Sequence, residues 1–372
     1  EQLRQALERT LGVPLFQEQV MQIAILAAGF TPGEADALRR SMAAWRRRGG
    51  LEQYHDKIVN GMTARGYDEA FARSIFEQIK GFSEYGFPES HAASFALLVY
   101  ASCWIKSHHP AEFLAALLNS YPMGFYSPSQ LVQDARRHGV EVRPVDVMAS
   151  EVDCTLEGLP HPPAVRLGLR MVDKLKAQSA GRIVAARREA PFDSSEDLAL
   201  RAGLDDHEMK LLAAADALAS LSGHRRQQVW DAAAPKRAPE LLAHSPVNED
   251  LLELPAAPEG EEIVWDYASL GLTLRRHPLA LLRPKLARRG LLSAEQLRRM
   301  PDGRRVHYCG IVTLRQQPDT ANGTIFVSLE DETGEVQMIC WKSVREAQRD
   351  VLLRSRLMAV HGKWQREGEV TN

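Results

Sequence analysis

Hydrophobic residues recur at spacings of three and four along the first 150 positions, a pattern typical of amphipathic helices. One helix is predicted to begin at Thr31, because Pro32 follows as a first-turn proline and Glu34 supplies the acid three residues on. Between positions 140 and 147 the residues alternate around a proline, which indicates a short extended segment. The pattern therefore predicts a mainly helical unit over residues 1–150.

A second helical segment, rich in alanine, leucine and arginine, runs from about residue 165 to 234. Turn-forming residues at 191–192, 202–203 and 222–223 separate its helices. Because these separators are closely spaced, the helices are expected to be short. We predict that this segment belongs to a domain over residues 151–235.

The charge of the chain changes sign after this domain. Residues 249–266 contain seven acidic residues, two prolines and no basic residue, which predicts a linker. Residues 275–305 contain ten Lys or Arg against two acids. We therefore expect an acidic linker followed by basic connecting helices over residues 236–300.

From residue 306 the hydrophobic period becomes two, which is typical of half-buried strands. Strands are predicted at 308–314, 324–329, 335–341 and 357–362. A hairpin turn is expected at 331–334, and a short helix at 342–353 precedes the last strand. This order is that of an OB-fold barrel, so an incomplete OB fold is predicted over residues 301–372.

Composition restricts the function classes more weakly than the pattern does. The formal net charge of −2 over 372 residues gives no global argument for nucleic acid, so any such argument must rest on local clusters. The four cysteines lie far apart without a CxxC pair, which favours a reduced, cytoplasmic protein over a zinc or disulfide scaffold. The longest apolar run, 92–105, is short of a membrane span, and no signal peptide is found. Neither end resembles a natural terminus, so a fragment is expected.

Two polar pairs at predicted helix starts are candidates for anion binding. Arg39 and Arg40 follow the capped start at Thr31, and guanidinium groups form paired hydrogen bonds with phosphate oxygens. Ser90 and His91 precede the apolar run, where we expect Ser90 to cap a buried helix and the imidazole to add a donor. The alternative is a solvated basic face in the first case and simple capping in the second.

These segments resemble the C-family DNA polymerases, the alpha subunits of bacterial DNA polymerase III. Residues 90–113 are similar to the family's SHAxxYAxxxYxxxWLKxxxPxEF segment, and residues 29–42 (GFTPGEADALRRSM) are similar to GYxxGEADxLRRAM. The resemblance implies that residues 1–150 form the helical fingers domain of a polymerase. The residues that it places at the incoming nucleotide are Arg39, Arg40, Ser90 and His91. Glu89 departs from the family, which has lysine there.

Residues 165–230 resemble the tandem helix-hairpin-helix region that follows the fingers and holds duplex DNA through backbone amides. The first hairpin has residues 174–178 (KLKAQ) where a GxG turn is expected, which puts its phosphate contact in question. Residues 212–218 (LAAADAL) are similar to the error-prone branch of the family. The resemblance favours Arg225 and Arg226 as DNA-binding residues, with a place in the helical core as the alternative.

Residues 315–334 resemble the RQxPxTAxGxxFxxLEDExG segment of the same error-prone branch. Proteins that bind single strands need aromatic faces for stacking and cations for phosphates. Arg315 at a strand end, Phe326 and Trp341 are therefore the predicted DNA-binding residues of the barrel. For both aromatic residues, packing in the core is an equal alternative.

The resemblance covers nearly the whole chain and implies part of an error-prone DNA-directed DNA polymerase that acts in damage-induced mutagenesis and translesion synthesis. Such chemistry needs paired metal ions on strand-borne carboxylates, and no Asp-x-Asp on a strand is found. We therefore expect Mg2+ to be held outside these residues and this segment alone to be inactive.

The partners that the resemblance implies are primer–template DNA, deoxynucleoside triphosphates, a sliding clamp and damage-response accessory proteins, and no membrane. No QxxLF-type clamp peptide is found. Two alternatives stay open: a non-catalytic scaffold of helix-hairpin-helix and OB modules that binds DNA, and the replicative alpha subunit, which residues 212–218 disfavour.

Overall fold

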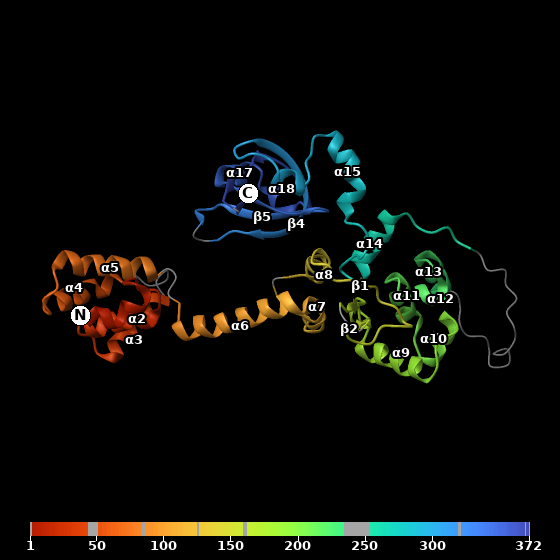
Figure 1. Ribbon diagram of the computed structural model, residues 1–372, viewed down its shortest axis with the longest axis horizontal. Coiled ribbons are helices and arrows are strands. Elements are labelled where there is room, and N and C mark those ends of the chain that lie inside the picture. The colour runs from red at the N-terminus through yellow and green to blue at the C-terminus, as the bar shows by residue number, and fades with distance from the viewer. Residues whose placement is uncertain are drawn as a thin grey trace. The chain divides into compact units, whose positions relative to one another are not determined.

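The computed structural model describes residues 2–43, 51–83, 87–124, 126–158, 162–233, 253–318, 321–368 and 370–371. The chain divides into two compact units, Glu1–His108 and His109–Asn372 (Figure 1). The four-part division predicted from the sequence is finer than this and stays a prediction. In the described part of the chain, every helix is too short or too polar to cross a lipid bilayer.

The first unit is helical, as predicted. Its helices are α1 (Gln2–Leu7), η1 (Glu8–Thr10), α2 (Gln17–Leu26), α3 (Pro32–Ala43), η3 (Glu52–Tyr54), α4 (His55–Thr63), α5 (Glu69–Ser83) and α6 (Glu89–His108). The apolar faces of α1 to α5 meet in one core around Ile23, Leu38, Met62 and Phe76, all of which are almost fully buried. Helix α3, which carries Arg39 and Arg40, is therefore held in place by this core.

The predicted start of α3 is confirmed by its hydrogen bonds. The Thr31 amide donates to Glu34 Oε2 at 2.9 Å, and the Glu34 amide donates to Thr31 Oγ1 at 3.4 Å, which forms a capping box. Glu34 also accepts a hydrogen bond from Lys57 of α4, and this bond is the main cause that lowers the Glu34 pKa to about 2. The start of α3 is thus tied to the neighbouring helix.

Helix α4 passes close to the C-terminal end of α2. A Cβ atom built on Gly61 would lie 2.1 Å from the Ala28 carbonyl oxygen, far inside van der Waals contact. Glycine costs helix stability, but here only a residue without Cβ permits this distance. The packing of α4 therefore requires Gly61.

The expectation that residues 90–105 form a buried helix is wrong. Helix α6 has no buried residue among those described, and its large apolar side chains are exposed: Phe95, Leu97, Leu98, Val99, Tyr100, Trp104 and Ile105. The apolar residues occur on every side of the helix, so no single face is polar.

The second unit begins with helices around a small mixed sheet. These elements are α7 (Pro110–Asn119), α8 (Pro128–Arg137), β1 (Val142–Arg143), β2 (Thr155–Glu157) and β3 (Ala164–Arg166), with strand order β1-β3-β2. The extended segment expected at 140–147 is confirmed as β1. The helical assignment from residue 165 is wrong at its start, because β3 pairs with both other strands.

The helix-hairpin-helix region follows this sheet. Its elements are η4 (Leu169–Met171), α9 (Ala177–Glu189), α10 (Ser195–Arg201), α11 (Asp206–Ala214), α12 (Ala219–Ser222) and α13 (Arg225–Ala233). The predicted separators at 191–192, 202–203 and 222–223 are confirmed as the ends of α9, α10 and α12. The helices are short, and their apolar residues share one core with α7 and the small sheet.

The acidic segment predicted as a linker is partly a helix. Helix α14 spans Glu259–Ser269, and within it Glu262 and Asp266 are buried. The linker prediction for residues 259–266 is therefore wrong. The helix can bury these two carboxylates because the guanidinium groups of Arg225 and Arg275 contact both of them. Residues 249–252 lie outside the described part.

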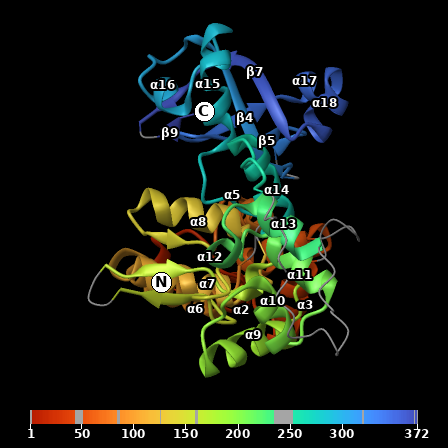
Figure 2. The same cartoon turned by 90° about the vertical axis from the view of Figure 1, so that its right-hand side faces the viewer.

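Helices α15 (Pro278–Arg288) and α16 (Ala294–Arg298) lead to the C-terminal barrel. The barrel elements are β4 (Arg305–Gln316), β5 (Ile325–Asp331), β6 (Gly334–Cys340), α17 (Lys342–Ala347), α18 (Arg349–Arg354), β7 (Leu357–Lys363), β8 (Arg366–Glu367) and β9 (Val370–Thr371). The sheet order β6-β5-β4-β7 is antiparallel throughout, and Figure 2 shows β4 and β7 side by side. The predicted order of strands, hairpin and helix is confirmed.

Candidate nucleic-acid interface

The arginine pair of α3 is arranged around one carboxylate. Arg39 Nη2 lies 2.8 Å from Asp36 Oδ1, and Arg40 Nη2 lies 3.1 Å from Asp36 Oδ2. The Arg40 side chain is 68% exposed, against 38% for Arg39. Asp36 therefore orients two adjacent guanidinium groups and leaves donors on Arg40 free for an anion.

The start of α6 differs from the sequence prediction. The helix begins at Glu89, and the Ala92 amide donates to the Pro88 carbonyl at 3.1 Å, so Ser90 lies within the first turn. The prediction that Ser90 caps the helix is wrong. Instead, Glu18 of α2 accepts a hydrogen bond from the Glu89 amide at 2.9 Å.

The His91 ring lies between two aromatic rings of the same segment. Its centroid is 5.1 Å from that of Phe87 and 4.5 Å from that of Phe95. Both Ser90 and His91 are exposed. They are accessible to a ligand. In the described part of the chain, no hydrogen bond or ion pair links either residue to Arg39 or Arg40.

The first hairpin forms without the expected glycines. Lys174 adopts φ 63°, the left-handed conformation that glycine adopts most easily. Helix α9 then begins after Lys176, whose side chain makes no capping hydrogen bond. Lys174, Lys176 and the first-turn residues Ala177 and Gln178 are exposed. The turn therefore presents a helix amino terminus and two lysines to solvent, which favours an anion.

The second hairpin is covered by α14 and the residues before it. Arg225 is 1% exposed: its Nη1 donates to the Glu262 carbonyl at 2.9 Å, and its Nη2 pairs with Asp266. The prediction that Arg225 binds DNA is therefore corrected to a structural role, because its guanidinium faces no solvent. Thr273 donates to Asp266 Oδ2 at 2.6 Å and completes this cluster. Burial raises the pKa of Glu262 in the same place.

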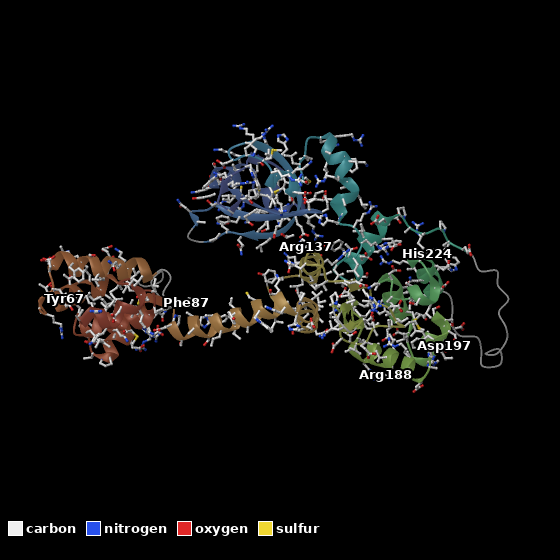
Figure 3. All side chains as sticks on the ribbon, in the orientation of Figure 1. Tyr67, Phe87, Arg137, Arg188, Asp197 and His224 are labelled. Carbon is white, nitrogen blue, oxygen red and sulfur yellow. The ribbon has the colours of Figure 1, made fainter. Side chains whose placement is uncertain are left out.

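Arg226 lies on the outer side of α13 and remains a candidate. Its Nη2 is 2.7 Å from Glu261 Oε2, and the side chain is 33% exposed. Next to it, His224 Nε2 lies 2.7 Å from the Leu254 carbonyl oxygen; Figure 3 labels His224 beside the start of α13. The acidic segment therefore occupies the solvent side of this helix start.

In the barrel, Trp341 is the most accessible of the predicted residues. It is 61% exposed and directly follows β6, so it does not belong to the core. Phe326 is half-buried on the outer face of β5, opposite Ile339 of β6. Arg315 donates to the Leu352 carbonyl at 2.8 Å and to the Ser355 carbonyl, which holds the turn between α18 and β7. Its contact with DNA stays a prediction.

Two cations beside Trp341 were not predicted from the sequence. Lys342 is exposed at the start of α17, and Arg345 lies one turn later with 22% of its side chain exposed. Both side chains pack against Gly323 in the loop between β4 and β5. An indole beside two cations is the combination that single-stranded nucleic acid requires. Both cations are visible in the KSVREA sequence at 342–347. That they lie beside the loop between β4 and β5 follows only from the fold.

Three family models match successive parts of the chain. The bacterial DNA polymerase III alpha subunit finger domain matches residues 1–66, the helix-hairpin-helix motif matches 139–228, and the OB-fold nucleic acid binding domain matches 306–371. These modules occur in the order predicted from the sequence.

Curated relatives match the whole chain. The error-prone DNA polymerase of Methylococcus capsulatus is 54% identical over 98% of the chain and 37% of its own length. Those of Burkholderia pseudomallei and Bordetella parapertussis are 57% and 56% identical over 100% and 98% of the chain, and over 35% of their own lengths.

Over nearly its whole length the chain is therefore similar to proteins named error-prone DNA polymerase. It spans 35–37% of the length of these three relatives. The residues matched by the three models form the helical, helix-hairpin-helix and OB folds expected from the sequence.

The metal ions of polymerase chemistry have no site among the described residues. No group of three or more His, Cys, Asp or Glu side chains that could hold a metal ion occurs in the described ranges. The acidic groups that do lie together, at Asp216, Glu262 and Asp266, are neutralised by Arg225 and Arg275. Because these carboxylates are already paired with arginines, they do not fit Mg2+.

Proposed function

We propose that this chain is the fingers-to-OB portion of an error-prone DNA-directed DNA polymerase that copies damaged templates. The observation that carries the proposal is the match of three successive modules, together with 54–57% identity to proteins named as error-prone DNA polymerases. The full-length protein would add a deoxynucleotide to a primer 3′ end. We also propose that carboxylates outside this chain hold the Mg2+ ions.

In this proposal Arg39 and Arg40 bind the triphosphate of the incoming nucleotide. Arg40 has exposed donors, and Asp36 keeps both guanidinium groups in fixed orientations before the ligand arrives. A pre-oriented guanidinium loses little side-chain entropy on binding and neutralises phosphate charge through paired hydrogen bonds. The arginine pair thus positions the nucleotide, while the bond-forming step takes place elsewhere in the protein.

The remaining modules would hold DNA without reading its sequence. The α9 amino terminus, with Lys174 and Lys176, suits a duplex phosphate. Trp341, with Lys342 and Arg345, suits a single strand, since stacking on an indole tolerates every base. Tolerance of this kind is what copying of damaged templates requires.

A primer-extension assay on the full-length protein tests the nucleotide site. Because a hydrogen bond to a charged group contributes about 1.5–3 kcal/mol, Arg40→Ala should raise the KM for the deoxynucleotide about 10- to 150-fold. The matched control is Arg73→Ala on α5, whose side chain is also exposed and paired with an acid, Glu69. An unchanged KM in Arg39→Ala and Arg40→Ala would refute the assignment. Comparison of damaged and undamaged templates tests the lesion-copying part.

Two further parts of the proposal concern the cell. All four cysteines are unpaired, which supports the reducing cytoplasm as the compartment. From the family resemblance we propose a sliding clamp and damage-response accessory proteins as partners of the full-length protein. Co-purification of the full-length protein from DNA-damaged and undamaged cells tests both kinds of partner.

A further inference from the structure

The outer face of β4 and β7 carries two pairs of basic side chains at directly opposite positions. In the antiparallel register Arg305 faces Lys363, and His307 faces His361. The imidazole ring centroids are 4.2 Å apart with the planes tilted by 59°. We call these four residues the β4–β7 basic strip. Successive members on one strand lie about 7 Å apart, and opposite members about 5 Å apart.

The strip has no internal counter-charge. All four side chains are exposed, and among the described residues none of them forms an ion pair or hydrogen bond with a carboxylate. The nearby Asp302 accepts a hydrogen bond from the Arg366 amide at 2.9 Å. Like charges directly opposite each other on a sheet are destabilising. An anion over the strip would relieve the repulsion between Arg305 and Lys363.

Protection of a sheet edge explains only part of the strip. Exposed edge strands often carry lysine, which prevents pairing with another chain. That role suits Lys363, because β7 is at one end of the strand order β6-β5-β4-β7. It suits His307 less well, because the Leu292 amide donates to the His307 carbonyl at 2.9 Å and so covers the other side of β4 there. Arg305 lies before the β4–β5 pairing, which begins at Ile311.

The acidic residues of the same outer face lie too far away to neutralise the strip. Glu330 of β5 is opposite Ile311 of β4, and Ile311 is four residues, about 14 Å of strand, from His307. At physiological salt this exceeds the Debye length of about 8 Å, so the field of Glu330 is largely screened. Glu330 is also within 3.9 Å of Arg137. Glu330 therefore leaves the positive charge of the strip largely uncompensated.

We propose that the β4–β7 basic strip binds the phosphate backbone of single-stranded DNA, as a contact separate from Trp341. The proposal rests on the proposed function. Trp341 adjoins the β5 end that pairs with Gln316, whereas the strip is at the opposite end of β4, on the order of 30 Å along the strand. A span of this length suits the 4–16 nucleotides that one OB fold typically covers. Imidazole faces supply further surface for a base beside the phosphate contacts.

The test is the salt dependence of binding to a fluorescein-labelled oligodeoxythymidine, measured by anisotropy with the 372-residue chain. Each lost phosphate contact makes the slope of log K against log salt shallower by about 0.7 for a single strand. The double variant Arg305→Gln/Lys363→Gln should therefore shift the slope by about 1.4. The matched control is Lys285→Gln/Arg289→Gln, which removes the same charge from exposed positions on and just after α15.

Two further variants separate the possible outcomes. The exchange Arg305→Lys/Lys363→Arg keeps the charge and should keep the slope, which would show that the charge at these positions, and not the particular side chain, sets the slope. Trp341→Ala should weaken binding without altering the slope. If the double variant keeps the unmodified slope while Trp341→Ala weakens binding, the strip proposal fails and the proposed function stands. If the unmodified chain does not bind the oligonucleotide at any salt concentration, both fail.

Discussion

Replacement of Arg225 by methionine removes the central cation of the buried cluster between α13 and α14. Arg225 is 1% exposed and contacts Asp266 and Glu262, whose side chains are 7% and 8% exposed. Breaking a buried pair by removal of one partner costs about 3–5 kcal/mol, because a buried charge is left without compensation. Arg275 still contacts both carboxylates and is 34% exposed, so the lower end, about 3 kcal/mol, is expected.

This loss converts to a thermal shift that can be measured. For a unit of 150–250 residues, about 2–4 °C of Tm corresponds to each kcal/mol, so Arg225→Met should lower the Tm of the second unit by about 6–12 °C. The neighbouring Arg226→Met is the matched control. It breaks only an exposed pair with Glu261, which contributes about 0–1 kcal/mol.

Calorimetry gives the shift, and hydrogen exchange locates it. Amides of α13 and α14 should lose protection in Arg225→Met and keep it in Arg226→Met. In Arg225→Met/Asp266→Leu the loss should be partly recovered, because a buried apolar pair needs no compensation. A Tm of Arg225→Met within about 2 °C of that of Arg226→Met would refute the structural role of the cluster.

Burial raises the pKa of Glu262 above its usual 4.5, so the folded chain retains a proton that the unfolded chain releases, and stability should fall as the pH rises from about 4.5 through the raised pKa. Glu262→Gln should flatten this part of a pH–Tm curve; an unchanged curve would contradict the assignment. Trp341→Ala should weaken single-stranded DNA binding about 5- to 150-fold by anisotropy, and equal affinity would place the stacking surface elsewhere. Gly61→Ala should lower the Tm of the first unit by about 10 °C or more, since its Cβ would lie 2.1 Å from the Ala28 oxygen, and a stabilised variant would exclude that close contact.

Local patterns predicted the elements whose stability is local. The α3 capping box needs only Thr31 and Glu34, three positions apart, and it is present. The β5–β6 hairpin needs alternating apolar residues and a tight turn, and Asp331 pairs with Gly334 as expected. In both cases the interacting residues are close in sequence, so the pattern contains the needed information.

Elements that depend on distant partners were not predictable in this way. The acidic composition of α14 indicates a solvated loop. The sequence pattern does not reveal that Arg225, 41 positions before Asp266, neutralises that carboxylate. Strand β3 is three residues long and exists through pairing with β1 and β2. Its length gives too little periodicity to distinguish it from a helix.

The sequence predicted which types of residue are candidates for the site better than it predicted their burial and contacts. Arg40 and Trp341 are exposed as a binding residue must be, whereas Arg225 is buried in an ionic cluster and Ser90 does not cap its helix. The two neighbouring arginines of α13 look equivalent in sequence, and only the position of α14 makes one structural and leaves the other accessible. Lys342 and Arg345 became candidates only because the structure places both beside the loop that contains Gly323.

The affinity of the 372-residue chain for primer–template DNA, measured by anisotropy from low to physiological salt, tests the central claim most directly. If the chain holds DNA in an error-prone polymerase, it should bind at low salt, lose affinity steeply as salt rises, and show little preference among sequences. Absence of binding at low salt, or binding that salt does not weaken, would contradict the account.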